Sequence, residues 1–102
     1  MYLTIREYQT NPQSIDEILR QDEQHFVPLI TRAPGFRDYY CIDGGNGTLT
    51  SVSLFASRFE GEEFNKVGMD WVQKNLGSLL PATPKVTSGE VRIHATAAAL
   101  VP

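Results

Sequence analysis

Hydrophobic and polar residues alternate over Tyr2–Gln9, where β-forming residues are frequent. This period of two predicts a first strand. Over Ser14–Arg32 the apolar residues recur every three or four positions instead, as they do on one face of a helix. We expect this helix to begin with a capping box at Ser14–Glu17. Pro28 lies inside it and has no N–H for the carbonyl of Gln24, so the helix should kink or loosen there.

Two further strand-like segments, Phe36–Asp43 and Leu49–Phe59, flank the run Gly44–Gly47. The Gly and Asn residues of this run tolerate positive φ, and a strand follows it, so a hairpin is favoured over a phosphate-binding loop. A second helix is expected from the acidic residues that begin at Glu60 to about Leu80. Lys85–Thr96 is the predicted fourth strand.

The predicted order is βαββαβ, which is typical of an α+β, ferredoxin-like fold. In this fold two helices cover one face of a four-stranded antiparallel sheet. The chain of 102 residues is long enough for one domain. We therefore expect a single domain over residues 1–96 and a small, apolar C-terminal tail over residues 97–102.

The strand pattern also predicts which residues face the helices. We assign to the helix-covered face Leu3, Ile5, Phe36, Tyr40, Ile42, Val52, Leu54, Val91 and Ile93. The opposite face then holds Tyr2, Thr4, Arg6, Tyr8, Tyr39, Cys41, Ser53, Phe55, Glu90, Arg92 and His94. This second set contains several aromatic residues, and a large exposed apolar patch usually marks an interface. We therefore favour a homodimer that packs through this sheet face over a sheet that tolerates exposed tyrosines.

Composition narrows the class of protein. A formal charge of -3 and a pI near 5.2 argue against a nucleic-acid partner. Cys41 is the single cysteine, which suits a reducing compartment. No segment has the length of a signal peptide core or of a membrane-spanning helix, so we expect no membrane association and a cytoplasmic protein. The two histidines, His25 and His94, lie far apart in the sequence, so no metal site is expected.

Each predicted helix carries one polar residue near the middle of its apolar face. At 100° per residue, Asn75 lies among the apolar residues of the second helix and Asp22 among those of the first. Buried polar groups persist when they have a partner or serve a ligand. Asn75 could bond a backbone carbonyl, and Asp22 could cap a local group or reach solvent. Alternatively, both could face one reaction pocket.

In the second interpretation the catalytic residues are Asp22, His25 and Asn75. Asp22 would accept a phenol proton, Asn75 would orient the substrate, and His25 would assist proton transfer. The substrate would contact Phe26, Gly68 and Trp71, where Gly68 leaves room for a ring and Trp71 supplies an aromatic wall. Core packing is the alternative for Trp71, and a surface position is the alternative for His25.

Several segments carry a resemblance to a known family: LTIREYQ, VPLITRAPGFRDYYCIDGG, SVSLFASRFE, DWVQKNLGSLLP and SGEV. Together they extend over nearly the whole chain. In these segments the sequence resembles the antibiotic biosynthesis monooxygenase-like family of dimeric α/β barrel proteins. The resemblance implies a homodimer whose two sheets form a barrel, with a ligand pocket between sheet and helices in each subunit.

Relatives in this family differ in chemistry. Some oxidise polycyclic phenols with molecular oxygen and no metal or flavin, and others degrade haem. The quinone-forming relatives have an Asn and a Trp on the third strand, whereas this strand reads SVSLFAS. Trp71 matches a Trp of the haem-degrading relatives, but Pro81 stands where they have a His. We expect a cofactor-independent monooxygenase of small aromatic or quinonoid compounds. The alternative is a non-catalytic dimeric protein that binds a small molecule.

Overall fold

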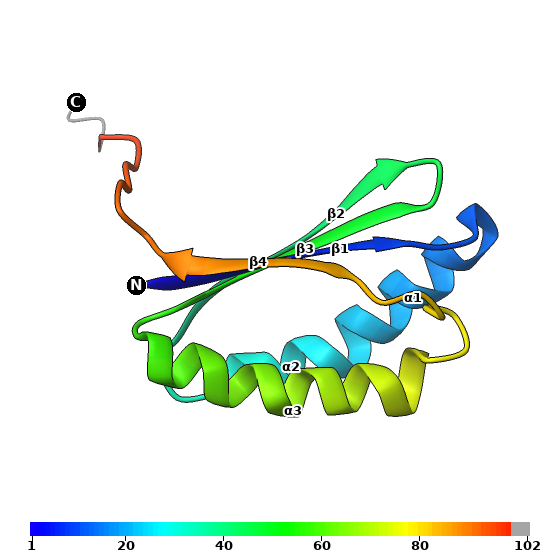
Figure 1. The fold of residues 1–102 in the computed structure, drawn as a ribbon, viewed down its shortest axis with the longest axis horizontal. Helices are drawn as coiled ribbons and strands as arrows, with labels where there is room; N and C mark the ends of the chain where they lie inside the picture. The colour runs from blue at the N-terminus through cyan, green and yellow to red at the C-terminus, as the bar shows by residue number, and fades with distance from the viewer. Residues whose placement is uncertain (99–102) are drawn as a thin grey trace.

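A computed structural model describes residues 1–98 of the chain. A four-stranded antiparallel sheet has the strand order β2-β3-β1-β4, and the helices cover one of its faces (Figure 1). The elements in chain order are β1 (Tyr2–Gln9), η1 (Pro12–Ser14), α1 (Ile15–Gln21), η2 (Asp22–Phe26), α2 (Val27–Thr31), β2 (Phe36–Gly45), β3 (Thr48–Phe55), α3 (Arg58–Leu76) and β4 (Lys85–Glu90). The predicted α+β, ferredoxin-like fold is confirmed.

The first helical region is not one continuous α-helix. Between α1 and α2, the segment η2 is a π-helix, in which Val27 N–H donates to Asp22 O. Pro28 follows this turn and has no N–H for the Gln24 carbonyl, so the wider turn lies where the sequence predicts loosening. The predicted capping box is wrong, because Ser14 makes no side-chain cap. The helical region already begins at Pro12, and the Asn11 side chain caps it by accepting from Gln13 N–H.

The predicted hairpin is confirmed. Gly45, Asn46 and Gly47 have φ values of 83°, 53° and 82°, the left-handed region that Gly and Asn adopt most readily. Gly47 also lies against the end of β1, where its carbonyl accepts from Thr10 N–H at 2.9 Å. In β2 the pairing with β3 shifts between Phe36 and Asp38, which places a bulge near the start of the strand.

The second helix, α3, begins where Ser57 caps it by accepting from Glu60 N–H. It lies close to β1, because a Cβ added at Gly61 would come within 2.8 Å of the Tyr2 ring. The helix ends at Leu76, earlier than expected, and β4 ends at Glu90 rather than at Thr96. Of the predicted tail, residues 99–102 lie outside the described part of the chain.

The assignment of the two sheet faces is wrong, except for Phe36, which packs against the core on the helix-covered face as predicted. The helix-covered face holds the set that was expected on the opposite face, including Tyr2, Thr4, Tyr8, Ser53 and Phe55, all of them buried. Ile5, Tyr40 and Ile42 are 36%, 59% and 52% exposed on the open face. The prediction assumed that one face of the sheet is exposed to solvent, so that the more aliphatic set of residues faces the helices. Here both faces are rich in apolar residues, and the phase of the pleat cannot be read from hydropathy.

The core consists of two clusters under the helices. One contains Tyr8, Ile15, Ile18, Leu49, Leu76 and Leu80. The other contains Phe26, Ile30, Phe55 and Phe64. Trp71 and Val72 of α3 pack against both clusters, so α3 joins them. None of the helices in the described residues is both long and apolar enough to cross a membrane.

Candidate active site

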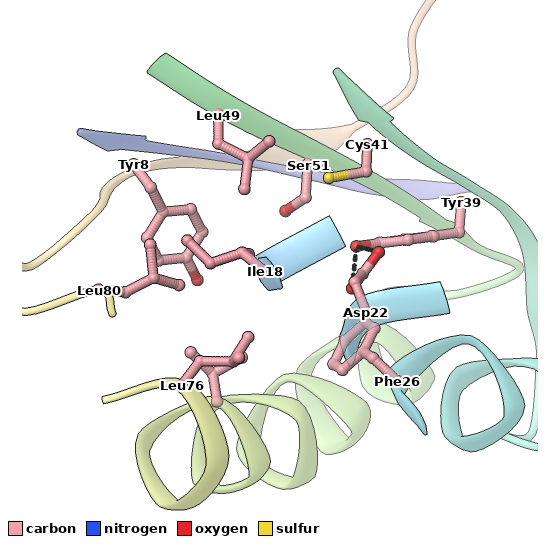
Figure 2. A pocket seen from close by; sticks show the side chains of 11 residues that line it. Tyr8, Ile18, Asp22, Phe26, Tyr39, Cys41, Leu49, Ser51, Leu76 and Leu80 are labelled. Atoms are coloured by element: carbon pink, nitrogen blue, oxygen red, sulfur yellow. Dashed lines mark hydrogen bonds between the residues drawn. The ribbon is translucent and has the colours of Figure 1, made fainter. Parts of the chain in front are cut away.

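A small cavity lies between the helix-covered face of the sheet and the helices (Figure 2). Its volume is about 40 Å³. Most of its wall is apolar, formed by Ile18, Phe26, Leu49, Val72, Leu76 and Leu80. The polar groups on the wall are those of Tyr8, Asp22, Tyr39, Cys41 and Ser51. The cavity therefore combines apolar surroundings with a few converging polar groups, as ligand sites do.

A carboxylate–phenol pair is the principal polar feature of this cavity. The Tyr39 hydroxyl donates to Asp22, 2.8 Å from Oδ1 and 3.0 Å from Oδ2. The two side chains point toward each other from η2 and β2 (Figure 2). Asp22 is the first residue of the π-helix, and such turns occur frequently at functional sites. The bulge in β2 lies just before Tyr39 and sets which face this side chain occupies.

Burial changes the acid–base properties of the pair. It raises the pKa of Asp22, and the hydrogen bond from Tyr39 offsets part of that rise. It also raises the pKa of Tyr39, as does the nearby Asp22 charge, so Tyr39 remains a neutral donor. Burial raises the pKa of Cys41 to about 11, which keeps its thiol protonated at neutral pH. Asp22 is thus a stronger base than an exposed aspartate, and Tyr39 holds it in place.

A half-buried cation, Arg6, lies next to the residues that line the cavity. Arg6 of β1 pairs with Ser51 of β3, and Ser51 pairs with Cys41 of β2, so the three form one row on the helix-covered face. Burial lowers the pKa of the Arg6 guanidinium, and the nearby Tyr8 and Tyr39 phenols offset part of this effect. Its Nε atom is buried and has no hydrogen-bond partner among the described residues. Arg6 therefore lies on the same face of the sheet as Tyr39, two strands from Cys41.

Of the six residues predicted for the site, Asp22 and Phe26 line the cavity. Trp71 does not line it, but packs behind Phe26 with ring centroids 5.4 Å apart. The alternative of core packing for Trp71 is therefore confirmed. Gly68 provides no room for a ligand, because a Cβ there would lie 3.0 Å from the Phe64 ring and 3.5 Å from the Phe26 ring.

The prediction that Asn75 points toward the sheet is wrong. Asn75 is exposed and donates to Trp71 O at 2.9 Å, within its own helix. The last turn of α3 contacts the core through Leu76 instead, which turns Asn75 outward. His25 is also exposed and lies outside the cavity lining. The structure therefore separates both residues from Asp22.

The sequence did not reveal the other polar groups of the cavity. Tyr8, Tyr39 and Cys41 were expected on the opposite face of the sheet, and Ser51 was not singled out. Their signal was present as polar residues at alternate positions of three strands. That signal points to a cavity only when the helix-covered face is known. Within the described residues, no group of three or more His, Cys, Asp or Glu side chains is placed to hold a metal ion.

Comparison with known proteins relates this fold to solved structures. A monooxygenase, ActVA-Orf6 of Streptomyces coelicolor in complex with nanaomycin D, matches with a TM-score of 0.75 and 15% identity over 95% of this chain and 92% of that chain. A protein described as an antibiotic biosynthesis monooxygenase matches with a TM-score of 0.71 and 14% identity over 89% of this chain and 98% of that chain. The haem degrader MhuD of Mycobacterium tuberculosis, with two haems bound, matches with a TM-score of 0.72 and 11% identity over 94% and 100%.

The chain therefore has the fold of antibiotic biosynthesis monooxygenase-like proteins, as the resemblance implied. Structural neighbours with this fold include monooxygenases and a haem degrader, and they bind small ligands. No family model matches the sequence. No curated protein matches it either.

Proposed function

We propose that this protein is a cofactor-independent monooxygenase that acts on small phenolic or quinonoid aromatic compounds. The observation that carries the proposal is the Asp22–Tyr39 pair on the wall of an otherwise apolar cavity. Asp22 has the position of a general base with a raised pKa. The fold shared with ActVA-Orf6, a monooxygenase, supports the same class of chemistry.

The chemistry requires only a few protein groups. Asp22 accepts the proton of a substrate phenol, and the electron-rich phenolate then passes an electron to molecular oxygen. Recombination of the resulting radical pair forms the new carbon–oxygen bond, and loss of water leaves a quinone. One oxygen atom stays in the product and the other leaves as water. The protein contributes the base, the orientation and surroundings from which water is excluded.

Each lining residue has a distinct part in this proposal. Tyr39 donates to Asp22 and keeps its oxygens directed at the cavity, where the substrate phenol takes a neighbouring position. Phe26 forms the aromatic wall beside it. Arg6 favours the phenolate through its positive charge, because it lies in the same sheet row as Ser51 and Cys41. His25 and Asn75 lie outside the cavity lining, and we assign them no part.

We also propose a homodimer formed through the open face of the sheet. On this face Ile5, Tyr40 and Ile42 are exposed and lie on neighbouring strands with Leu3, Val52 and Leu54. An exposed apolar patch of this extent is typical of an interface. Packing of the same face of a second copy would cover it symmetrically. A cytoplasmic location fits the single, protonated Cys41.

Oxygen uptake with a panel of hydroquinones and anthrones tests the proposed activity. Wild type should consume oxygen above the buffer rate, and Asp22→Asn should lose most of that activity, on the order of 100-fold or more as for loss of a general base. Glu23→Gln is the matched control, since Glu23 is the next residue in the same π-helix and is exposed. Its rate should equal that of wild type.

Two outcomes would contradict the proposed activity. Wild type with no turnover above buffer would favour the non-catalytic small-molecule binder instead. Full activity of Asp22→Asn would remove the base from the mechanism. Asn75→Leu and His25→Gln complete the panel, and both should retain activity because neither side chain reaches the cavity.

A further inference from the structure

A second, outer pocket of about 270 Å³ adjoins the inner cavity. It lies between the end of α3 and the connection to β4, and its lining comprises Tyr8, Met69, Val72, Gln73, Gly77, Leu80, Pro81, Ala82, Thr83 and Pro84. Gln73, Gly77 and residues 81–83 are exposed, so this pocket reaches solvent. The outer pocket thus provides a route from solvent to the wall of the inner cavity.

Three side chains line both spaces: Tyr8, Val72 and Leu80. Tyr8 reaches this wall from β1, and Leu80 reaches it from the segment after α3 (Figure 2). The backbone of Leu80 is fixed by its N–H bond to Leu76 O at 2.8 Å. Both side chains are buried, at 7% exposure for Tyr8 and 9% for Leu80. Tyr8, Val72 and Leu80 therefore form a wall that the inner cavity and the outer pocket share.

The inner cavity alone is too small for an aromatic ring. Its volume of about 40 Å³ suits water, since a dry cavity that binds benzene has about 150 Å³. Joined to the outer pocket it reaches the lower end of the range of ligand pockets, about 300–1,000 Å³. A substrate phenol can therefore reach Asp22 only if side chains of the shared wall move and its remaining rings extend into the outer pocket.

The Tyr8 hydroxyl lacks a strong acceptor. Its partner among the described residues is Met69 Sδ at 3.9 Å, and a thioether is a weak acceptor. Met69 lines the outer pocket, so this hydroxyl points from the wall toward that pocket. Burial raises the pKa of Tyr8, so it stays a neutral donor at neutral pH. A buried donor with so weak a partner is suited to an oxygen acceptor on a ligand.

We propose that the inner cavity and the outer pocket form one binding site, in which Tyr8 donates to the ligand and the ligand displaces the Leu80 side chain from the shared wall. This rests on the proposed function, because it places the phenol oxygen at Asp22. The ligand class is a fused-ring phenol with a carbonyl acceptor at the end opposite the phenol. The phenol lies at Asp22, the rings displace the Leu80 side chain, and the carbonyl accepts from Tyr8.

A matched pair of probes tests this by calorimetry under anaerobic conditions. 5-Hydroxy-1-tetralone has a phenol and a carbonyl at opposite ends of two fused rings, and 5,6,7,8-tetrahydro-1-naphthol lacks the carbonyl. Wild type should bind the tetralone about five-fold more tightly, as one additional hydrogen bond provides. Tyr8→Phe should remove this preference and leave the affinity for tetrahydronaphthol unchanged. Leu80→Ala should bind both probes more tightly.

Controls separate a change in binding from a change in folding. Tyr8→Phe preserves the ring and removes only the hydroxyl. If Leu80→Ala unfolds the protein, the milder substitution Leu80→Val replaces it. Leu80→Val should also tighten the binding of both probes. Val67→Ala alters an exposed residue of α3 outside both spaces and should bind both probes like wild type. An unchanged probe preference in Tyr8→Phe would overturn the role of Tyr8. Weaker or unchanged binding in both Leu80 variants would overturn the joined site.

The outcome for binding is independent of turnover. If the probes bind as described but no phenol supports oxygen uptake, the joined site stands and the monooxygenase proposal fails. If phenols are turned over but Tyr8→Phe and the Leu80 variants leave probe binding unchanged, the monooxygenase proposal stands and the joined site fails. Failure of both probes to bind wild type and both Leu80 variants would overturn the joined site.

Discussion

Asp22 combines a cost in stability with the role of base that we propose for it. A carboxylate on an apolar wall loses hydration, and the phenol of Tyr39 compensates only in part. The raised pKa that follows from burial would be a disadvantage for a purely structural group. For a base that must take a proton from a phenol, it is an advantage.

The pKa of Asp22 predicts how stability changes with pH. Because burial raises this pKa above its ordinary value of 3.8, the folded protein holds a proton that the unfolded chain has released. As the pH rises above 3.8, the Asp22 carboxyl therefore lowers the free energy of unfolding. Relative to wild type, Asp22→Asn should gain stability as the pH rises from 3.8 towards neutrality. Urea unfolding across this range measures the difference.

Glu23→Gln is again the control, because it removes a carboxylate from the neighbouring, exposed position of the same π-helix. The exposed Glu17, whose pKa is lowered to about 2 by its bonds to Arg20 and Gln21, has the opposite dependence. Its contribution is present in every variant and cancels in the comparison. A pH-independent difference between Asp22→Asn and wild type would contradict the raised pKa of Asp22.

The sequence placed two side chains correctly on the cavity wall, because the apolar face of one helix determined their direction. Asp22 and Phe26 were found because the apolar face of the first helix is broad and Asp22 lies near its middle. Asn75 satisfied the same angular test but is exposed, since the last turn of α3 faces the core through Leu76. A helical wheel gives angles but does not show which angle meets the core at each end of the helix.

At the scale of elements, the β2–β3 hairpin sets the positions of Tyr39 and Cys41, and its turn predicts two different mutational costs. Gly45 and Gly47 have nearly equal φ values, 83° and 82°. A Cβ at Gly45 would meet nothing within 4 Å, whereas one at Gly47 would lie 2.0 Å from Thr10 O. Gly45→Ala should cost roughly 1–2 kcal/mol of stability from the positive φ alone.

Gly47→Ala should cost this amount and about 1–3 kcal/mol more, since the added methyl must push the end of β1 away. Chemical denaturation of the two variants measures both values. Each variant is the control for the other, because they differ in the contact and not in φ. Equal losses would show that the approach of Thr10 to the hairpin is not a tight contact.

The same hairpin illustrates what element-level prediction can and cannot do. Gly and Asn at four consecutive positions identified the turn, because few other residues accept positive φ. The capping box was wrong, since Asn11 and Pro12 had already begun the helical region before Ser14. The bulge between Phe36 and Asp38 left no signal in the sequence, yet it sets the face on which Tyr39 lies.

At the scale of the whole molecule, the order of elements predicted the ferredoxin-like fold, because few topologies are compatible with βαββαβ. The phase of the sheet could not be predicted in the same way. Both faces of the sheet carry several apolar or aromatic residues, so the alternation does not show which face the helices cover. The open face that results is the basis of the proposed dimer.

The dimer proposal predicts a mass of twice the 11.4 kDa chain in light scattering at micromolar concentration. Ile5→Lys should shift the protein to the monomer, since it places a charge at the centre of the open sheet face. Phe59→Lys is the control, because Phe59 is 73% exposed on α3, on the other side of the molecule's sheet. A monomeric wild type, or a dimeric Ile5→Lys, would contradict the interface.

The most direct measurement of the proposed chemistry is oxygen uptake followed as a function of pH, below the pKa of the substrate phenol. With Asp22 as the base, kcat/KM should rise with pH through a midpoint above 3.8, because only the deprotonated carboxylate accepts the proton. In Asp22→Asn this rise should disappear and the rate should stay low throughout. An identical pH profile in Asp22→Asn, or no turnover by wild type at any pH, would contradict the assignment of Asp22 as the catalytic base.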